Sequence, residues 1–210
     1  MEKLDLKKQY AHLYKPRHNR VTVVDVPVFK FAILDGAIEE GQSPGTSPAF
    51  QQAMEALYGI SYTIKFLSKY SKENPIDYTV MALEALWWVE DGDFDIKVPS
   101  NWRWTAMLMQ PDHISSELFQ AGLEQVSKKK PNPAFDLLRF ETFHEGLAMQ
   151  TMHIGPYAEE PATLEKMDAF AQENGYIYRG KHHEIYLGDP RRAKPENLKT
   201  VLRHPVEKVG

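Results

Sequence analysis

The sequence predicts an α+β fold in which two β-α-β-β modules share an antiparallel sheet and enclose a ligand cleft on a pseudo-two-fold axis. Three observations support this prediction. The same order of elements occurs in both halves, strands outnumber helices, and the links between strands suit antiparallel neighbours. The first half is expected to hold elements at Phe29–Gly36, Ser47–Tyr70, Tyr78–Val89 and Trp102–Gln110. The second half is expected to hold Ala148–Gly155, Pro161–Asn174, Lys181–Asp189 and Leu198–His204.

This internal repeat sets the expected organisation of the chain. Residues 1–20 are polar and basic and are interpreted as an N-terminal arm. Residues 21–111 form the first repeat, and residues 112–210 form the second. We expect the seam between the repeats to form the pocket.

The first repeat begins with two strand-like segments. Val21–Val26 is β-branched and ends at Pro27, which is typical of an edge strand. Phe29–Leu34 is apolar and predicts a buried strand. Ser47 and Pro48 then suit the N-cap and the first position of a long helix.

The middle of the chain predicts a central strand, a returning strand, a helix and a hairpin. Tyr78–Val89 is apolar on both faces, and Trp102–Gln110 is expected to return antiparallel to it. Asp112 is interpreted as the cap of a third helix. Leu137–Phe143 and Leu147–Ile154 are expected to pair as a hairpin that turns at residues 145–146.

The last elements are a helix and two strands. Pro161 is expected to open the helix and Gly175 to close it. Lys181–Asp189 and Leu198–His204 are the two C-terminal strands.

The composition excludes several classes of function. At 210 residues and 42% hydrophobic content, the chain resembles a globular protein with a large core. The net charge of −4 gives no reason to expect direct nucleic-acid binding. The chain has no cysteine, which excludes thiolate chemistry and fits the cytoplasm, and no apolar run suited to a membrane. Whether it forms a homodimer is left open.

Glu184 is the first candidate for chemistry. Alternate residues of a strand share a face, so Glu184 is expected beside His182 and Tyr186. A carboxylate amid aromatic side chains is costly to bury unless it is paired or hydrogen-bonded. The alternative is a surface glutamate paired with Arg179 or Lys181.

Glu84 raises the same question in the first repeat. It shares its strand face with Leu86 and Trp88, an apolar neighbourhood. It is interpreted either as a ligand-binding carboxylate or as a structural one that holds a backbone group or a tyrosine hydroxyl at the seam.

Aromatic residues supply candidate pocket walls. All four tryptophans lie between residues 87 and 104, and flat side chains stack well on planar or cationic ligands. The alternative is that they fill the core. No metal-ligand spacing, glycine-rich phosphate loop or nucleophile elbow is present, so neither a metal nor a cofactor is expected.

Two segments resemble the GyrI-like small-molecule-binding family. They are MHIGPY at Met152–Tyr157 and HHEIYLGDP at His182–Pro190. This family includes the gyrase inhibitory protein and the effector-binding domains of multidrug-responsive transcription regulators. The resemblance implies paired β-α-β-β modules and a glutamate, Glu184, at the base of an aromatic pocket. No helix-turn-helix signature accompanies it.

The segments Tyr78–Trp88 and Trp102–Pro111 are similar to the stand-alone branch of that family, which is implicated in hydrolysing cyclopropanoid genotoxins. The resemblance implies Glu184 as general base, with Tyr186 or Tyr157 orienting the water or polarising the leaving oxygen. The expected wall residues are Trp88, Trp102, Trp104 and Phe143. Two alternatives stay open: a non-catalytic multidrug sensor or sequestering protein that uses the same pocket, and a protein inhibitor that uses its outer surface.

Overall fold

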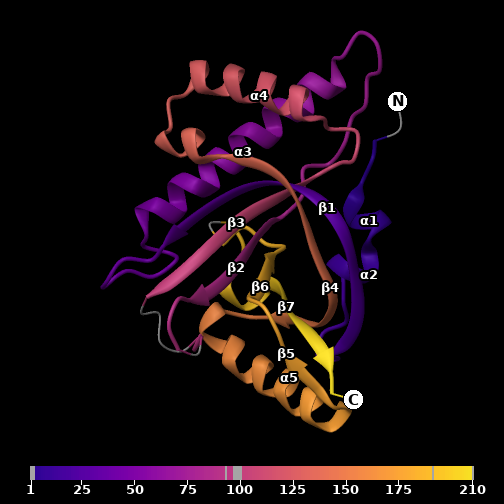
Figure 1. The fold of residues 1–210 in the computed structure, drawn as a ribbon, viewed down its shortest axis with the longest axis vertical. Coiled ribbons are helices and arrows are strands. Elements are labelled where there is room, and N and C mark those ends of the chain that lie inside the picture. The colour runs from indigo at the N-terminus through magenta and orange to yellow at the C-terminus, as the bar shows by residue number, and fades with distance from the viewer. Residues whose placement is uncertain (1–2, 93, 97–100, 191, 210) are drawn as a thin grey trace.

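Seven antiparallel strands form the centre of the molecule in a computed structural model that describes residues 3–92, 94–96, 101–190 and 192–209 (Figure 1). The strand order is β4-β1-β3-β2-β6-β7-β5, and an additional pairing of β4 with β7 closes six strands into a barrel. The strands are β1 (Thr22–Ala37), β2 (Leu83–Val89), β3 (Trp102–Gln110), β4 (Arg139–Ile154), β5 (Tyr176–Tyr178), β6 (His182–Tyr186) and β7 (Lys199–Lys208). The predicted α+β class and antiparallel sheet are confirmed.

Helices cover the barrel at two ends of the view in Figure 1, with α3 and α4 at the top and α5 at the bottom. The helices are α1 (Leu6–Gln9), α2 (Ala11–Tyr14), α3 (Pro48–Lys69), α4 (Ser116–Lys129) and α5 (Glu160–Asn174), with short 3-10 turns η1 (Pro133–Leu137), η2 (Tyr157–Glu159) and η3 (Pro195–Asn197). Ser47 caps α3 by accepting from the Phe50 N–H, as predicted. Gly175 ends α5 at φ 66°, also as predicted. The α4 cap is Ser115 rather than Asp112, because its hydroxyl accepts from the Leu118 N–H.

The predicted hairpin at residues 137–154 is wrong. β4 is one continuous strand of 16 residues and pairs with β1 on both sides of Gly146. Gly146 has φ 71°, a value that glycine adopts readily, so the strand bends there without reversing. β1 is likewise one strand that runs through Pro27, and it pairs with β4 in the same register on both sides of this proline.

The N-terminal arm is packed against the barrel. Leu13 and Tyr14 are buried, and Leu4 forms an isolated bridge with Tyr78. That bridge lies outside β2, which begins at Leu83 rather than at the predicted Tyr78. The first 20 residues therefore contribute to the core.

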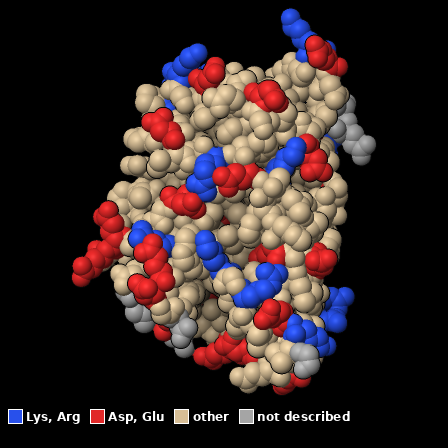
Figure 2. Space-filling view, viewed as in Figure 1, with Lys and Arg blue, Asp and Glu red and all other residues tan. Residues whose placement is uncertain are grey.

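The strands of each half are neighbours in the same relative order, β1-β3-β2 and β4-β7-β6, but the two halves run around the barrel in opposite directions. The duplication of the modules stays a prediction. Figure 2 shows acidic and basic side chains interspersed over most of the face in view. Within the described part of the chain, no helix is both long and apolar enough to cross a membrane.

Candidate active site

The register between β2 and β6 sorts the candidate residues onto two faces of the sheet. Residues directly opposite each other in an antiparallel pair point to the same side. Glu184 lies opposite Ala85, whereas Glu84 lies opposite Ile185. Glu184 and Glu84 therefore point to opposite sides of the sheet.

The side of Glu184 faces the helices, and we call it the helix face. Trp87 lies opposite His182 on this face, and its ring packs 5.2 Å from the ring of Phe50 in α3. Leu202 lies opposite Glu184 and packs with Met167 of α5. The helix face at the β2–β6 seam thus lies between α3 and α5.

Glu184 is buried here and accepts hydrogen bonds. Only 6% of its surface is exposed, and its Oε1 lies 3.2 Å from His182 Nε2, which donates in the tautomer with hydrogen on that nitrogen. Tyr186 also hydrogen-bonds to Glu184, and its oxygen accepts from Trp87 Nε1 at 3.0 Å. The predicted cluster of Glu184, His182 and Tyr186 is present, and Glu184 pairs with neither Arg179 nor Lys181 in the described hydrogen bonds and ion pairs.

The pKa values of both tyrosines of the site, Tyr186 and Tyr157, are raised. Burial, the charge of Glu184 and the hydrogen bond to it raise the pKa of Tyr186 well above its ordinary value. Tyr157 is 38% exposed and its ring meets that of Tyr186 edge-on at 5.9 Å. Burial, followed by the charges of Glu160 and Glu184, raises the pKa of Tyr157 to about 12. Both hydroxyls are therefore hydrogen-bond donors at neutral pH.

Aromatic rings enclose this cluster. Trp102 packs 5.5 Å from Trp87 and 4.9 Å from Phe94, and Phe94 stacks on the His182 ring at 5.6 Å. Trp104 lies on the same face, opposite Trp87 on β3. The structure thus places Trp102 and Trp104 on the side of Glu184, and their role as pocket walls stays a prediction.

Trp104 packs against β1 at Gly36, which has no side chain. A Cβ on Gly36 would lie 2.1 Å from the Trp104 ring, so only glycine fits at this position. The Trp104 Nε1 is buried without a hydrogen-bond partner among the described residues.

Two groups near Glu184 were missed by sequence reasoning. Alternation along β2 does not distinguish Trp87 from Trp88, and the pairing of Trp87 with Trp104 shows that Trp87 is the one on the side of Glu184. Glu160 begins α5 and is 2% exposed, and its position before a proline resembles an ordinary helix start. Burial, followed by the charge of Glu184, raises the pKa of Glu160 well above its ordinary value.

Three predicted site residues lie elsewhere. Glu84 and Trp88 are on the other side of β2, where Glu84 lies inside the barrel. Trp88 lies near an open hollow of about 340 Å³, where Lys181 Nζ sits 3.1 Å from the centre of its ring. Phe143 meets Phe31 edge-on at 6.3 Å, also away from Glu184.

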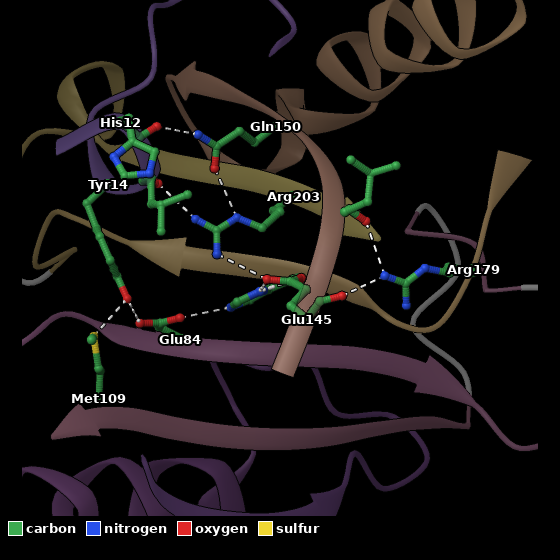
Figure 3. Close-up of polar contacts among 11 residues, drawn as sticks. His12, Tyr14, Glu84, Met109, Glu145, Gln150, Arg179 and Arg203 are labelled. Atoms are coloured by element: carbon green, nitrogen blue, oxygen red, sulfur yellow. Dashed lines mark hydrogen bonds and ion pairs between the residues drawn. The ribbon is translucent and has the colours of Figure 1, made fainter. Parts of the chain in front are cut away.

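Glu84 belongs to a buried chain of polar side chains inside the barrel, shown in Figure 3, which we call the interior network: Tyr14, Glu84, His183, Glu145 and Arg203. The Tyr14 hydroxyl donates to Glu84 at 2.7 Å, and His183 lies 3.1 Å from Glu84 and 2.9 Å from Glu145. Arg203 donates to Glu145 at 3.1 Å. This arrangement matches the structural interpretation of Glu84, in which the carboxylate holds a tyrosine hydroxyl.

The charges of the interior network balance one another. Burial alone would lower the pKa of His183, but Glu145 and Glu84 raise it to about 9. Burial works to raise the pKa of Glu145, but His183 and Arg203 outweigh it and bring that pKa to about 2. His183 and Glu145 are therefore ionised together at neutral pH.

Arg203 also anchors the N-terminal arm. Its guanidinium donates to the Leu13 carbonyl at 2.8 Å and to Gln150 at 2.9 Å, and Gln150 in turn donates to the His12 carbonyl at 2.7 Å (Figure 3). The interior network therefore holds the arm and the barrel together. The described residues contain no cluster of three side chains that could hold a metal ion.

The model of the GyrI-like small-molecule-binding domain matches residues 21–207. The chain belongs to the GyrI-like family. An uncharacterized conserved protein from Listeria innocua is 37% identical, with a TM-score of 0.88 over 98% of this chain and 100% of its own. Two hydrolases from Listeria innocua are 34% and 36% identical, with TM-scores of 0.82 and 0.84 and the same coverage. No curated protein matches the chain.

Proposed function

We propose that this GyrI-like protein is a hydrolase that adds water to a planar, cyclopropane-bearing electrophile bound over Glu184. The observation that carries the proposal is the buried carboxylate of Glu184, which accepts hydrogen bonds beneath a wall of aromatic rings. The two similar hydrolases from Listeria innocua support the reaction class. The resemblance to cyclopropanoid cyclohydrolases suggests the substrate class.

The aromatic wall accounts for binding. Trp87, Trp102 and Phe94 present flat surfaces at 4.9–5.5 Å spacing, which suits a planar ligand that exchanges places with part of the packed wall. A strained ring held against Glu184 needs little further activation, because positioning beside a base lowers the barrier by itself.

Glu184 acts as the general base. It takes a proton from a water molecule while the water oxygen attacks a carbon of the cyclopropane ring. His182 and Tyr186 orient the carboxylate through their hydrogen bonds. Tyr157, which reaches the surface, lies where it can donate a hydrogen bond to the substrate.

Mass spectrometry of the purified protein with a cyclopropane-bearing alkylating agent tests the proposal. We expect the wild-type protein to produce the ring-opened, hydrated product and Glu184→Gln to lose about 10²–10⁴-fold in rate, the usual contribution of a general base. Glu141→Gln, the same change at an exposed position of β4, serves as the matched control and should retain the wild-type rate.

Two outcomes would contradict the proposal. Full turnover by Glu184→Gln would exclude this residue as the base. Tight binding of the alkylating agent by the wild-type protein without any hydrated product would instead favour a sensor or sequestering protein that uses the same aromatic site.

A further inference from the structure

We propose that Glu160 is a second catalytic carboxyl, which carries a proton next to Glu184 and donates it to the substrate oxygen that becomes negative when the ring opens. This step rests on the proposed function, but the protonation of Glu160 does not. Glu160 and Glu184 come from different elements, α5 and β6, and both are buried.

The first turn of α5 lies over the end of β6. Tyr157, three residues before Glu160, meets the ring of Tyr186 at 5.9 Å. Thr200 of β7 lies directly opposite Tyr186, so it borders the same area. The Glu160 side chain therefore enters the site from the helix side, above the strand that carries Glu184.

Glu160 is buried with few hydrogen-bond partners. Its Oε1 and the Thr200 hydroxyl make no hydrogen bond of good geometry among the described residues, although Thr200 lies close enough to Glu160 to lower the pKa of its carboxyl. Buried polar atoms are seldom left unpaired in folded proteins, and those that are often mark a place for water or a ligand. Two such atoms near Glu184 indicate a place where a polar group of the substrate, or a water molecule, can accept or donate a hydrogen bond.

The helix start leaves Glu160 without the donors that would favour its ionised form. The N–H of Glu160 donates to the Tyr157 carbonyl, and the next residue, Pro161, has no N–H. A carboxylate at a helix N-terminus is normally stabilised by free backbone N–H groups. Here this stabilisation is reduced at the first two positions of the helix.

Most of the groups that face Glu160 favour its neutral form. β6 contributes the charge of Glu184 and the hydroxyl of Tyr186, and η2 contributes Tyr157. The Thr200 hydroxyl of β7 acts in the opposite direction and lowers the pKa of Glu160, but burial and the charge of Glu184 outweigh it. Two adjacent buried carboxyls do not both ionise readily. Since Glu184 has His182 and Tyr186 as hydrogen-bond donors, whereas Glu160 has only the Thr200 hydroxyl beside it, the proton belongs on Glu160.

The two carboxyls then complete one hydrolysis. In a cyclopropane conjugated to a carbonyl, the water oxygen bonds to a ring carbon, and Glu184 takes the water proton. The ring C–C bond breaks, and its electron pair moves through the conjugated system to the carbonyl oxygen. Glu160 gives its proton to that oxygen. Transfer of a proton from Glu184 to Glu160 restores the starting state, with one water added to the substrate.

Glu160→Gln tests the proton donor, because glutamine keeps the shape and cannot transfer a proton. We expect kcat to fall by about 10²-fold, the lower part of the range for general acid catalysis, while the ligand dissociation constant from tryptophan fluorescence changes little. The high-pH limb of the kcat profile, which reports loss of the acid's proton, should disappear. Glu159→Gln, at the adjacent exposed position, should keep both the rate and the limb. Glu160→Asp, which keeps a carboxyl, should keep the limb.

Carbon-13 NMR of protein labelled in its glutamate carboxyls tests the protonation separately. We expect one carboxyl carbon of the wild-type protein to titrate far above the ordinary glutamate range, and its signal to be absent from Glu160→Gln. If the wild-type protein shows this signal but hydrolyses no cyclopropane, the proposed function fails and the protonated Glu160 stands. A full rate with an intact high-pH limb in Glu160→Gln, or the absence of any high-titrating carboxyl, overturns the inference about Glu160.

Discussion

Tyr14→Phe removes one hydroxyl from the interior network and should lower the free energy of unfolding by about 2 kcal/mol. The Tyr14 side chain is 1% exposed, and its hydroxyl donates to Glu84 at 2.7 Å. Hydrogen bonds to charged groups contribute about 1.5–3 kcal/mol. Glu84 keeps His183 as a partner at 3.1 Å, which places the expected cost in the lower half of that range.

Urea denaturation followed by tryptophan fluorescence measures this cost. With a slope of about 2 kcal/mol per molar urea, typical of proteins of this size, the midpoint should fall by roughly 1 M. Tyr10→Phe is the matched control in the same arm, because the Tyr10 ring packs on Phe29 at 4.8 Å and its loss of a hydroxyl should change stability by less than about 0.5 kcal/mol. Equal midpoints for Tyr14→Phe and Tyr10→Phe would refute the reasoning.

A double-mutant cycle locates the effect. If Tyr14 stabilises the fold through Glu84, combining Tyr14→Phe with Glu84→Gln should cost less than the sum of the single changes, with a coupling of about 0.5–3 kcal/mol. Below the melting transition, Tyr14→Phe should leave hydrolysis near the wild-type rate, because Glu184 lies on the opposite side of the sheet.

The remaining predictions concern pH and the aromatic wall. The pKa of Glu145 falls from 4.5 to about 2 in the fold, so its contribution to stability is complete above pH 4.5 and is lost as the pH falls towards 2. The pKa of His183 rises from 6.5 to about 9, so its contribution is complete below pH 6.5 and is lost as the pH rises through 9. Thermal midpoints measured from pH 2 to pH 9 should therefore be highest between about pH 4.5 and 6.5 and fall on both sides, and a midpoint that rises towards either end would contradict this account. Trp102→Phe should weaken binding of the planar substrate several-fold, by about 1 kcal/mol, whereas Trp88→Phe, on the other side of the sheet, should leave the dissociation constant in a fluorescence titration unchanged.

Local signals in the sequence were enough to predict several elements. Ser47-Pro48 placed the start of α3, and Gly175 placed the end of α5. The strand at Trp102–Gln110 was predicted with its observed bounds. These features depend on neighbours within a few residues, and capping and alternation are encoded at that range.

The distribution of the site over two faces could not be predicted in this way. Alternation shows that Glu184 shares a side with Tyr186, and that Glu84 shares one with Trp88, but it does not relate one strand to another. A shift of one residue in register between β2 and β6 would bring Glu84 and Glu184 to the same side. The observed register puts Ala85 opposite Glu184 and separates the two glutamates.

Long-range contacts explain why the burial of Tyr14 and Glu160 could not be predicted from the sequence. Tyr14 lies in a polar segment whose composition suggests an exposed arm, yet it reaches Glu84, 70 positions away in the chain. Glu160 resembles an ordinary acidic residue in the first turn of a helix. Only the packing of α5 over β6 reveals that its carboxyl is buried near Glu184.

The order His183-Glu184 on β6 lets one strand serve two purposes. His183 is directed into the barrel, where Glu84 and Glu145 hold it in place, while Glu184 is directed towards the helices. The hydrogen bonds of His183 therefore fix the strand on one side, and Glu184 gains a defined position on the other without sharing a partner with the interior network. Because the two sides use separate hydrogen bonds, Tyr14→Phe should reduce stability with little effect on the rate, whereas Glu184→Gln should reduce the rate far more than Tyr14→Phe does.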